Sequence, residues 1–219
     1  FNGNELLFYI IVSLLLLYAL LRRSFPKYFN DLYRLFFRTT LKQLQIREQL
    51  MQTPLPSFLL NIFFLLSGGL YIGFLLEYGR LIPEKGFWLM AIYSIIGLSG
   101  IYLGKFVGLK LSGWLFNMKE AADSYIFIVF IVNKMIGLLL LPFLILLAYT
   151  KDYVYSVSLT LSVVAVVGLL TYRFVLTYGI VRKQVKVNPF HFFLYLCAFE
   201  IAPLLLIYKG LLLFFHITA

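Results

Sequence analysis

The stretch FIVNKMIGLLLLPF, residues 130–143, lies in one of the most apolar parts of the chain, yet it carries Asn133 and Lys134 side by side. Long apolar runs of this kind predict helices that cross a membrane. A lysine at the centre of such a helix costs roughly 2.5–3.5 kcal/mol on membrane-insertion scales. We therefore expect Lys134 to face the interior of a helix bundle and to meet a polar or charged partner there.

The whole chain has the composition of a membrane protein. Of its 219 residues, 62% are hydrophobic and only 13% are charged, and a soluble domain of this length could not cover so much apolar surface. The pattern predicts an all-α, polytopic helix bundle with about six spans. They are residues 6–21, 57–76, 87–107, 124–149, 154–180 and 190–215. At 1.5 Å rise per residue each can cross a hydrocarbon core ~30 Å thick, the first only just.

The basic residues predict the orientation of these spans. The net charge is +10, and most of the 19 Lys and Arg residues fall in the loops and helix ends on one side of the predicted spans. Basic residues favour the cytoplasmic side, so both termini are expected outside. Because the basic residues lie between apolar spans, we attribute the positive charge to membrane orientation and not to nucleic-acid binding. We divide the chain into a first span (residues 1–23), a cytoplasmic segment (24–56) and a five-helix bundle (57–219).

The cytoplasmic segment has the pattern of an amphipathic helix. Phe25, Phe29, Leu32 and Phe36 share one face, and Arg34, Arg38 and Lys42 recur at four-residue spacing on another. Two interpretations remain open: a helix lying on the inner leaflet, or a docking surface for a soluble partner. The residues that would form this lipid or partner surface are Lys27, Arg34, Arg38, Lys42 and Arg47.

Two spans carry glycines at spacings that allow helices to approach closely. The third span has Gly100, Gly104 and Gly108, and the second has Gly69 and Gly73. Small residues at four-residue spacing let helix backbones pack together in lipid. We expect them to pack within the chain, with contacts to a second copy as the less favoured interpretation.

The predicted topology suggests a partner for Lys134. Glu200 lies about ten residues from the inner end of the sixth span, which is also the depth of Lys134 in the fourth. Opposite charges at one depth favour an ion pair facing the bundle interior. Asn133, Cys197 and His191 extend this predicted polar site, and Pro142 and Pro203 are expected to kink their helices above it. Arg173, near an inner helix end, is expected to snorkel towards water.

Two of the predicted helices resemble a known family. The stretches at 125–149 and 190–212 are similar to the DUF4271 family of polytopic inner-membrane proteins of Bacteroidota. The residues that carry the resemblance are Tyr125, Asn133, Lys134, Gly137, Leu141, Pro142, His191, Leu194, Tyr195, Leu196, Cys197, Glu200, Pro203, Tyr208 and Lys209. The resemblance implies a bacterial inner-membrane location and adds Tyr195 to the polar site. It implies no reaction.

Three functional hypotheses follow. The first is a non-enzymatic subunit of a cell-envelope complex for secretion or envelope biogenesis, in which the Lys134–Glu200 pair organises the bundle and the partners are lipid and other membrane proteins. The second is a small ion- or proton-coupled transporter that uses Lys134 and Glu200. The third is a membrane enzyme acting on a lipid. We expect no catalytic set, metal or cofactor, because no Cys/His cluster or phosphate-binding loop accompanies these residues.

Overall fold

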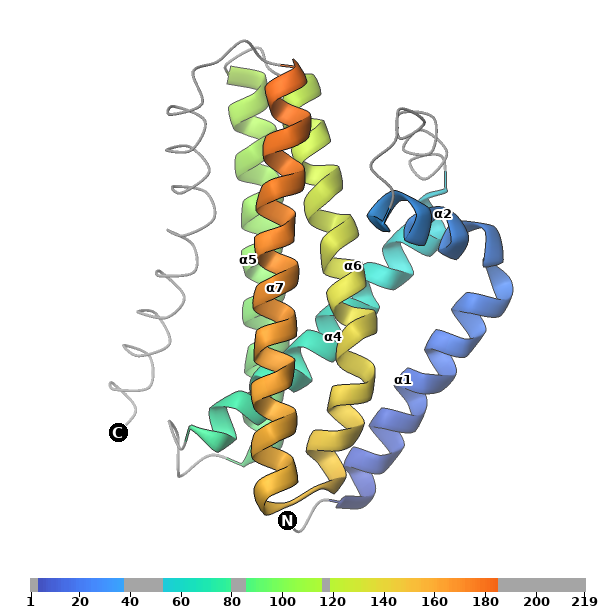
Figure 1. The fold of residues 1–219 in the computed structure, drawn as a ribbon, viewed down its shortest axis with the longest axis vertical. Helices are drawn as coiled ribbons and strands as arrows, with labels where there is room; N and C mark the ends of the chain where they lie inside the picture. Colours follow the sequence, from blue (N-terminus) through green and yellow to red (C-terminus); the bar gives the residue numbers. More distant parts are fainter. Residues whose placement is uncertain (1–3, 38–52, 80–85, 116–118, 185–219) are drawn as a thin grey trace.

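The computed structural model describes residues 4–37, 53–79, 86–115 and 119–184. Within them every regular element is an α-helix, which confirms the predicted all-α class. The helices in chain order are α1 (Asn4–Ser24), α2 (Pro26–Phe37), α4 (Pro54–Tyr78), α5 (Phe87–Leu115), α6 (Lys119–Tyr149) and α7 (Asp152–Gln184). In Figure 1, α6 runs beside α5 and α7, α4 crosses the bundle obliquely, and α1 leans away from α6 toward α2.

Five of the helices are long and apolar enough to cross a membrane. Their apolar stretches are Glu5–Ser24, Pro54–Tyr78, Phe87–Leu111, Ala122–Tyr149 and Asp152–Arg173. They match the first five predicted spans in order and nearly in length. The sixth predicted span, residues 190–215, lies outside the described residues. The described residues therefore contain five of the six helices that hydropathy predicts to cross a membrane.

Burial separates two central helices from three peripheral ones. In their most apolar stretches, 67% of the α6 residues and 56% of the α4 residues are buried, against 22% in α1 and 11% in each of α5 and α7. The peripheral helices expose large apolar side chains such as Leu103 and Val164, which are 65% and 63% exposed. Lipid tails can cover such side chains, whereas water would penalise their exposure.

Glycines mark the points where α4 approaches its neighbours. A Cβ added at Gly69 would lie 3.0 Å from the Cα of Ile95 on α5, and one added at Gly137 would lie 2.9 Å from the Cα of Phe64 on α4. A Cβ added at Gly73 would lie 3.4 Å from the Cα of Ala91 on α5. Gly100 and Gly104 differ, since an added Cβ would meet no atom of the described residues within 4 Å. The closest helix crossings thus involve Gly69 and Gly137.

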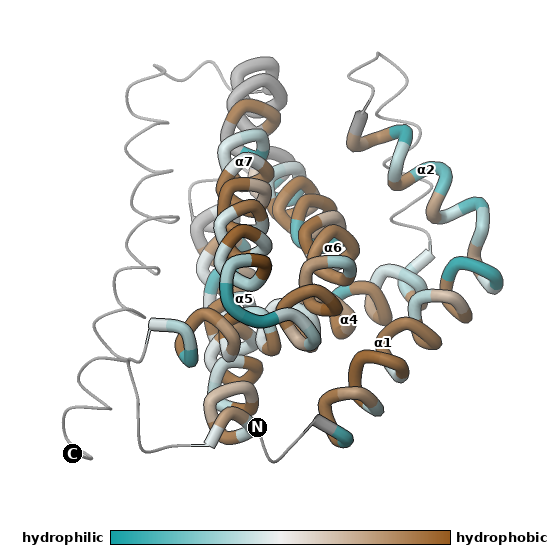
Figure 2. Tube along the Cα trace, turned by 60° about the horizontal axis from the view of Figure 1, so that its bottom comes forward, coloured by the Kyte–Doolittle hydropathy of each residue, from teal (hydrophilic) through white to brown (hydrophobic). Residues whose placement is uncertain are grey.

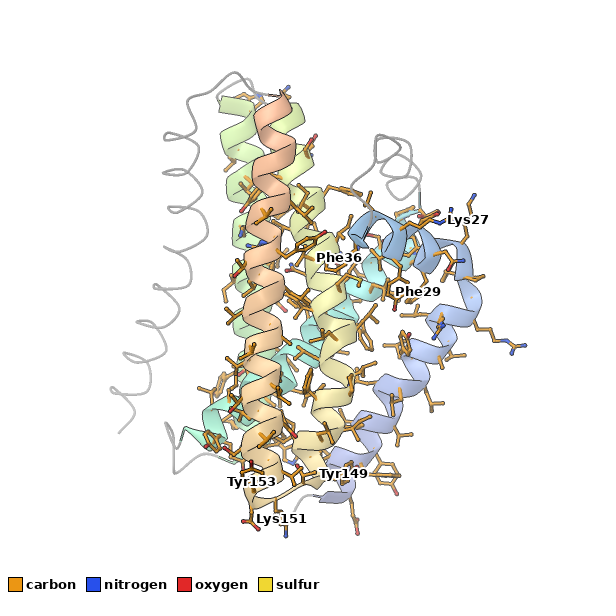
Figure 3. The ribbon with its side chains drawn as sticks, viewed as in Figure 1. Lys27, Phe29, Phe36, Tyr149, Lys151 and Tyr153 are labelled. Carbon is orange, nitrogen blue, oxygen red and sulfur yellow. The ribbon has the colours of Figure 1, made fainter. Side chains whose placement is uncertain are left out.

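The two ends of the bundle carry different structures. Figure 3 shows Lys27 of α2 beside the upper part of the bundle and Lys151, in the turn between α6 and α7, at its lower end. Thr150 and Lys151 form this short turn, and Asp152 follows with a φ of 53°. Aspartate tolerates this left-handed conformation better than most residues do. The tight turn sets α6 and α7 antiparallel and adjacent.

Helix α2 is amphipathic and packs its apolar face on the bundle. Tyr28, Phe29, Leu32 and Phe36 are buried, while Lys27 and Arg34 are exposed. Figure 2 shows hydrophilic residues recurring along α2 beside the mainly hydrophobic α1. The Phe36 ring packs on Tyr172 of α7 at 5.1 Å between centroids, and the Tyr172 hydroxyl donates to the Phe36 carbonyl at 2.7 Å. Protein side chains, rather than lipid alone, therefore cover the apolar face.

Candidate functional site

Asn133 and Lys134 lie at the centre of α6 and face different neighbours. Both are buried, with side chains 1% and 3% exposed. Consecutive helical residues are rotated by about 100°, so the two polar groups cannot share one set of partners. Each forms the centre of its own hydrogen-bonded group.

Lys134 connects α6 to α2 and α4. Its Nζ donates to the hydroxyl of Tyr28 at 3.0 Å and to Oγ of Ser57 at 2.7 Å. The ammonium also lies 5.7 Å from the centroid of the Tyr28 ring, a distance at which the ring face attracts a cation. Hydrogen bonds to a charged donor are stronger than neutral ones. Lys134 therefore fastens α2, which is not a membrane span, to the core of the bundle.

Tyr28 is a neutral partner for this lysine. Burial raises the pKa of Tyr28 above its ordinary value of 10.0, although the hydrogen bond with Ser57 opposes the shift. The phenol therefore stays protonated at physiological pH and does not become a counter-ion. The partners of Lys134 in the described part of the chain offset its desolvation by hydrogen bonding.

Asn133 connects α6 to α5 and α7. The Tyr102 hydroxyl donates to Asn133 Oδ1 at 3.1 Å, and it also hydrogen-bonds with Arg173 of α7. Asn133 Nδ2 is buried and has no hydrogen-bond partner among the described residues. A buried unpaired amide is costly, so this side of α6 retains unused hydrogen-bonding capacity.

Two cations that the sequence did not assign to the site lie on this second side. Arg173 is only 3% exposed, so the expectation that it snorkels to water is wrong. Lys105 of α5 lies near Arg173, so the two positive charges repel each other. Its Nζ is 5.6 Å from the centroid of the Tyr125 ring. Lys105 is one of the basic residues that the sequence predicts at the inner helix ends, because hydropathy does not show how α5 is rotated about its axis. One sequence feature could have placed Lys105 beside Tyr102: the two residues are three positions apart, about one helical turn.

The remaining predicted site residues divide into two groups. Pro142 lies within α6, whose helical conformation continues through it, and it borders an apolar groove. The other predicted members lie outside the described residues: Glu200, His191, Tyr195, Cys197, Pro203, Arg38, Lys42 and Arg47. The Lys134–Glu200 ion pair accordingly stays a prediction, while Lys134 already has two hydroxyl partners.

Comparison with known proteins identifies a family. The family model described as Domain of unknown function (DUF4271) matches residues 7–211, nearly the whole chain. No curated protein and no solved structure matches. The matched residues include both sides of the polar site, nearly all of the first apolar helix and the whole of the other four.

Proposed function

The chain belongs to the DUF4271 family, and we propose that it is a non-enzymatic, integral subunit of a cell-envelope complex in the bacterial inner membrane. In this role the bundle anchors the protein, and α2 presents a basic surface to a partner. Secretion and envelope biogenesis are the processes in which a small, loop-poor membrane subunit would serve.

The observation that carries this proposal is the way α2 is held. Its inner face is fixed by the Lys134–Tyr28 hydrogen bond, by the Tyr172–Phe36 hydrogen bond and by buried aromatic rings. Its outer face presents Lys27 and Arg34 to the surroundings. A pre-organised surface loses little conformational freedom on binding. This geometry suits docking to an acidic surface better than it suits a reaction.

The distribution of charge supports a cytoplasmic position for α2. Arg22 and Arg23 lie in the last turn of α1, next to α2, and Lys27 and Arg34 lie on α2 itself. Lys151 lies at the end of the bundle that is remote from α2. By the positive-inside rule the α2 end faces the cytoplasm. The N-terminus would then lie on the outer side, as the sequence predicts.

The test is gentle affinity purification from native membranes, followed by mass spectrometry. We would compare the wild type with Lys27→Gln/Arg34→Gln, and use Lys151→Gln at the opposite end as the matched control, all at equal abundance. We expect a defined set of proteins to co-purify with the wild type and the control and to be lost with the double variant. Recovery of the wild type alone in several mild detergents, or retention of the set by the double variant, would contradict the proposal.

A charge-coupled transporter is the second candidate, favoured by the buried Lys134 beside the unpaired amide of Asn133. Purified protein in proteoliposomes would be tested for collapse of an imposed pH gradient, with Lys134→Met as the variant. The transporter hypothesis predicts that the pH gradient collapses in vesicles with the wild type and persists in vesicles with the folded Lys134→Met variant. Wild-type vesicles as tight as empty ones would rule out this candidate for protons.

A further inference from the structure

We propose that the groove between α1 and α6 binds an acyl chain of an anionic phospholipid, whose phosphate is held by Arg22, Tyr18 and Tyr33. The groove has a volume of about 620 Å³ and is bordered by α1, α2, α6 and α7. None of its described lining residues is charged. This volume lies within the range of ~300–1,000 Å³ typical of small-molecule sites.

The long part of the groove is shaped for a hydrocarbon chain. Leu15, Met135, Leu139, Ile145 and Leu169 contribute to its walls. From Met135 to Ile145 the wall formed by α6 extends ~15 Å, at 1.5 Å per residue. Such a surface has no hydrogen-bonding groups to hold ordered water. In a bilayer it fills with apolar chains.

One end of the groove has the chemistry of an anion site. Tyr18 of α1 and Tyr33 of α2 line it and hydrogen-bond with one another. Arg22, one turn beyond Tyr18, donates to the Tyr18 hydroxyl at 3.5 Å and also lies near the Tyr33 side chain. Arginine beside hydroxyl donors favours phosphate. The cation lies where α1 ends and α2 begins, which is the level of lipid headgroups in the proposed topology.

The size of the groove selects a lipid over a helix. A helix ~10 Å wide and ~30 Å long would occupy about 2,400 Å³, several times the volume that is present. A single acyl chain needs only a narrow apolar channel with one polar end. The observed groove has both features, and Arg22, beside its tyrosine end, distinguishes an anionic headgroup from a zwitterionic one.

Native mass spectrometry of the full chain would test this proposal. The detergent-solubilised protein would be titrated with phosphatidylglycerol or phosphatidylcholine carrying identical acyl chains. We expect the wild type to retain phosphatidylglycerol roughly fivefold better, the effect of one basic side chain near a membrane surface. Arg22→Gln should abolish this preference, whereas Arg23→Gln, the same change at the next residue, should keep it.

A second variant tests the apolar part of the groove. Leu139→Trp fills it and should reduce retention of both lipids, whatever their headgroup. Equal retention of the two lipids by the wild type would overturn the proposal, as would equal behaviour of the two arginine variants. Undiminished lipid binding by a folded Leu139→Trp protein would also overturn it. Should that variant fail to fold, the arginine comparison still decides.

Discussion

Helices α5 and α6 are alike in sequence character and opposite in position. They contain 29 and 31 residues, and both are apolar with no marked polar face. Yet 67% of the apolar stretch of α6 is buried and only 11% of that of α5. Hydropathy alone therefore does not decide which helix is central. Helix α6 carries its own glycine, Gly137, at its crossing with α4, whereas α5 meets α4 through Ile95. Helix α6 also carries the adjacent polar pair Asn133 and Lys134, and each feature can be tested against a counterpart on α5.

The largest effect is expected from Gly137→Val compared with Gly100→Val. A Cβ at Gly137 would lie 2.9 Å from the Cα of Phe64, and backbone can shift only with repacking of the α4–α6 crossing. Overpacking of this kind costs about 3 kcal/mol. Gly100→Val should change the free energy of unfolding in mixed micelles by no more than about 0.5 kcal/mol. Equal losses at both positions would mean that Gly137 tolerates an added side chain no worse than Gly100 does.

Lys134→Met should release α2 from the bundle. The variant loses two hydrogen bonds of a charged donor, each worth about 1.5–3 kcal/mol before desolvation of the lysine is offset. We expect trypsin to cut at Lys27 and Arg34 roughly tenfold faster than in the wild type. Lys110→Met, a loss of one lysine on α5, is the control and should leave the rate unchanged. Unaltered cleavage in Lys134→Met would show that aromatic packing alone holds α2.

The predicted ion pair between Lys134 and Glu200 can be tested on the same central helix. If Lys134 and Glu200 form a structural pair, then Lys134→Met and Glu200→Gln should each lower the amount of folded protein. Combining the two changes should restore part of it, because no uncompensated charge remains buried. The measurement is abundance in the membrane and monodispersity after solubilisation. If the double variant instead showed the sum of the two losses, Lys134 and Glu200 would not form a pair. The hydroxyl groups of Tyr28 and Ser57 would then be the partners of Lys134.

A smaller effect is expected for Tyr102→Phe, on the other side of α6. The change removes the donor to Asn133 Oδ1, and hydrogen bonds between membrane helices contribute about 0.6 kcal/mol on average. Asn133→Leu in the Tyr102→Phe background should recover stability, because it removes the orphaned amide. Unfolding in mixed micelles would measure both variants. A further loss in the double variant would mean that Asn133 has a partner beyond Tyr102.

The smallest effect is expected at the surface of α5. Lys110 Nζ lies 3.3 Å from Asp123 Oδ1, with side chains 55% and 41% exposed. Exposed pairs of this kind contribute about 0–1 kcal/mol. Lys110→Met should change the free energy of unfolding by less than about 0.5 kcal/mol. A loss as large as that of Lys134→Met would remove the contrast between the central and peripheral helices.

The sequence alone determined which segments form helices apolar enough for a membrane. The spans beginning at Ser57, Phe87 and Ser124 were placed within a few residues of their observed positions, and α2 showed its amphipathic pattern directly. The burial of Lys134 also followed from sequence, because a charge in an apolar helix has few favourable positions. These properties are local sums of side-chain transfer free energies, so they can be read residue by residue.

The tertiary structure alone decided which groups meet. Tyr28 and Ser57 lie 106 and 77 residues from Lys134 along the chain, and nothing in their local sequence distinguishes them from other hydroxyls near a helix end. The burial of Arg173 and the exposure of Gly100 likewise depend on how each helix is rotated about its axis. In lipid, a uniformly apolar helix has no polar face that must turn toward water, so the hydrophobic effect does not set its rotation. It is set instead by shape at the crossings and by the pairing of buried polar groups.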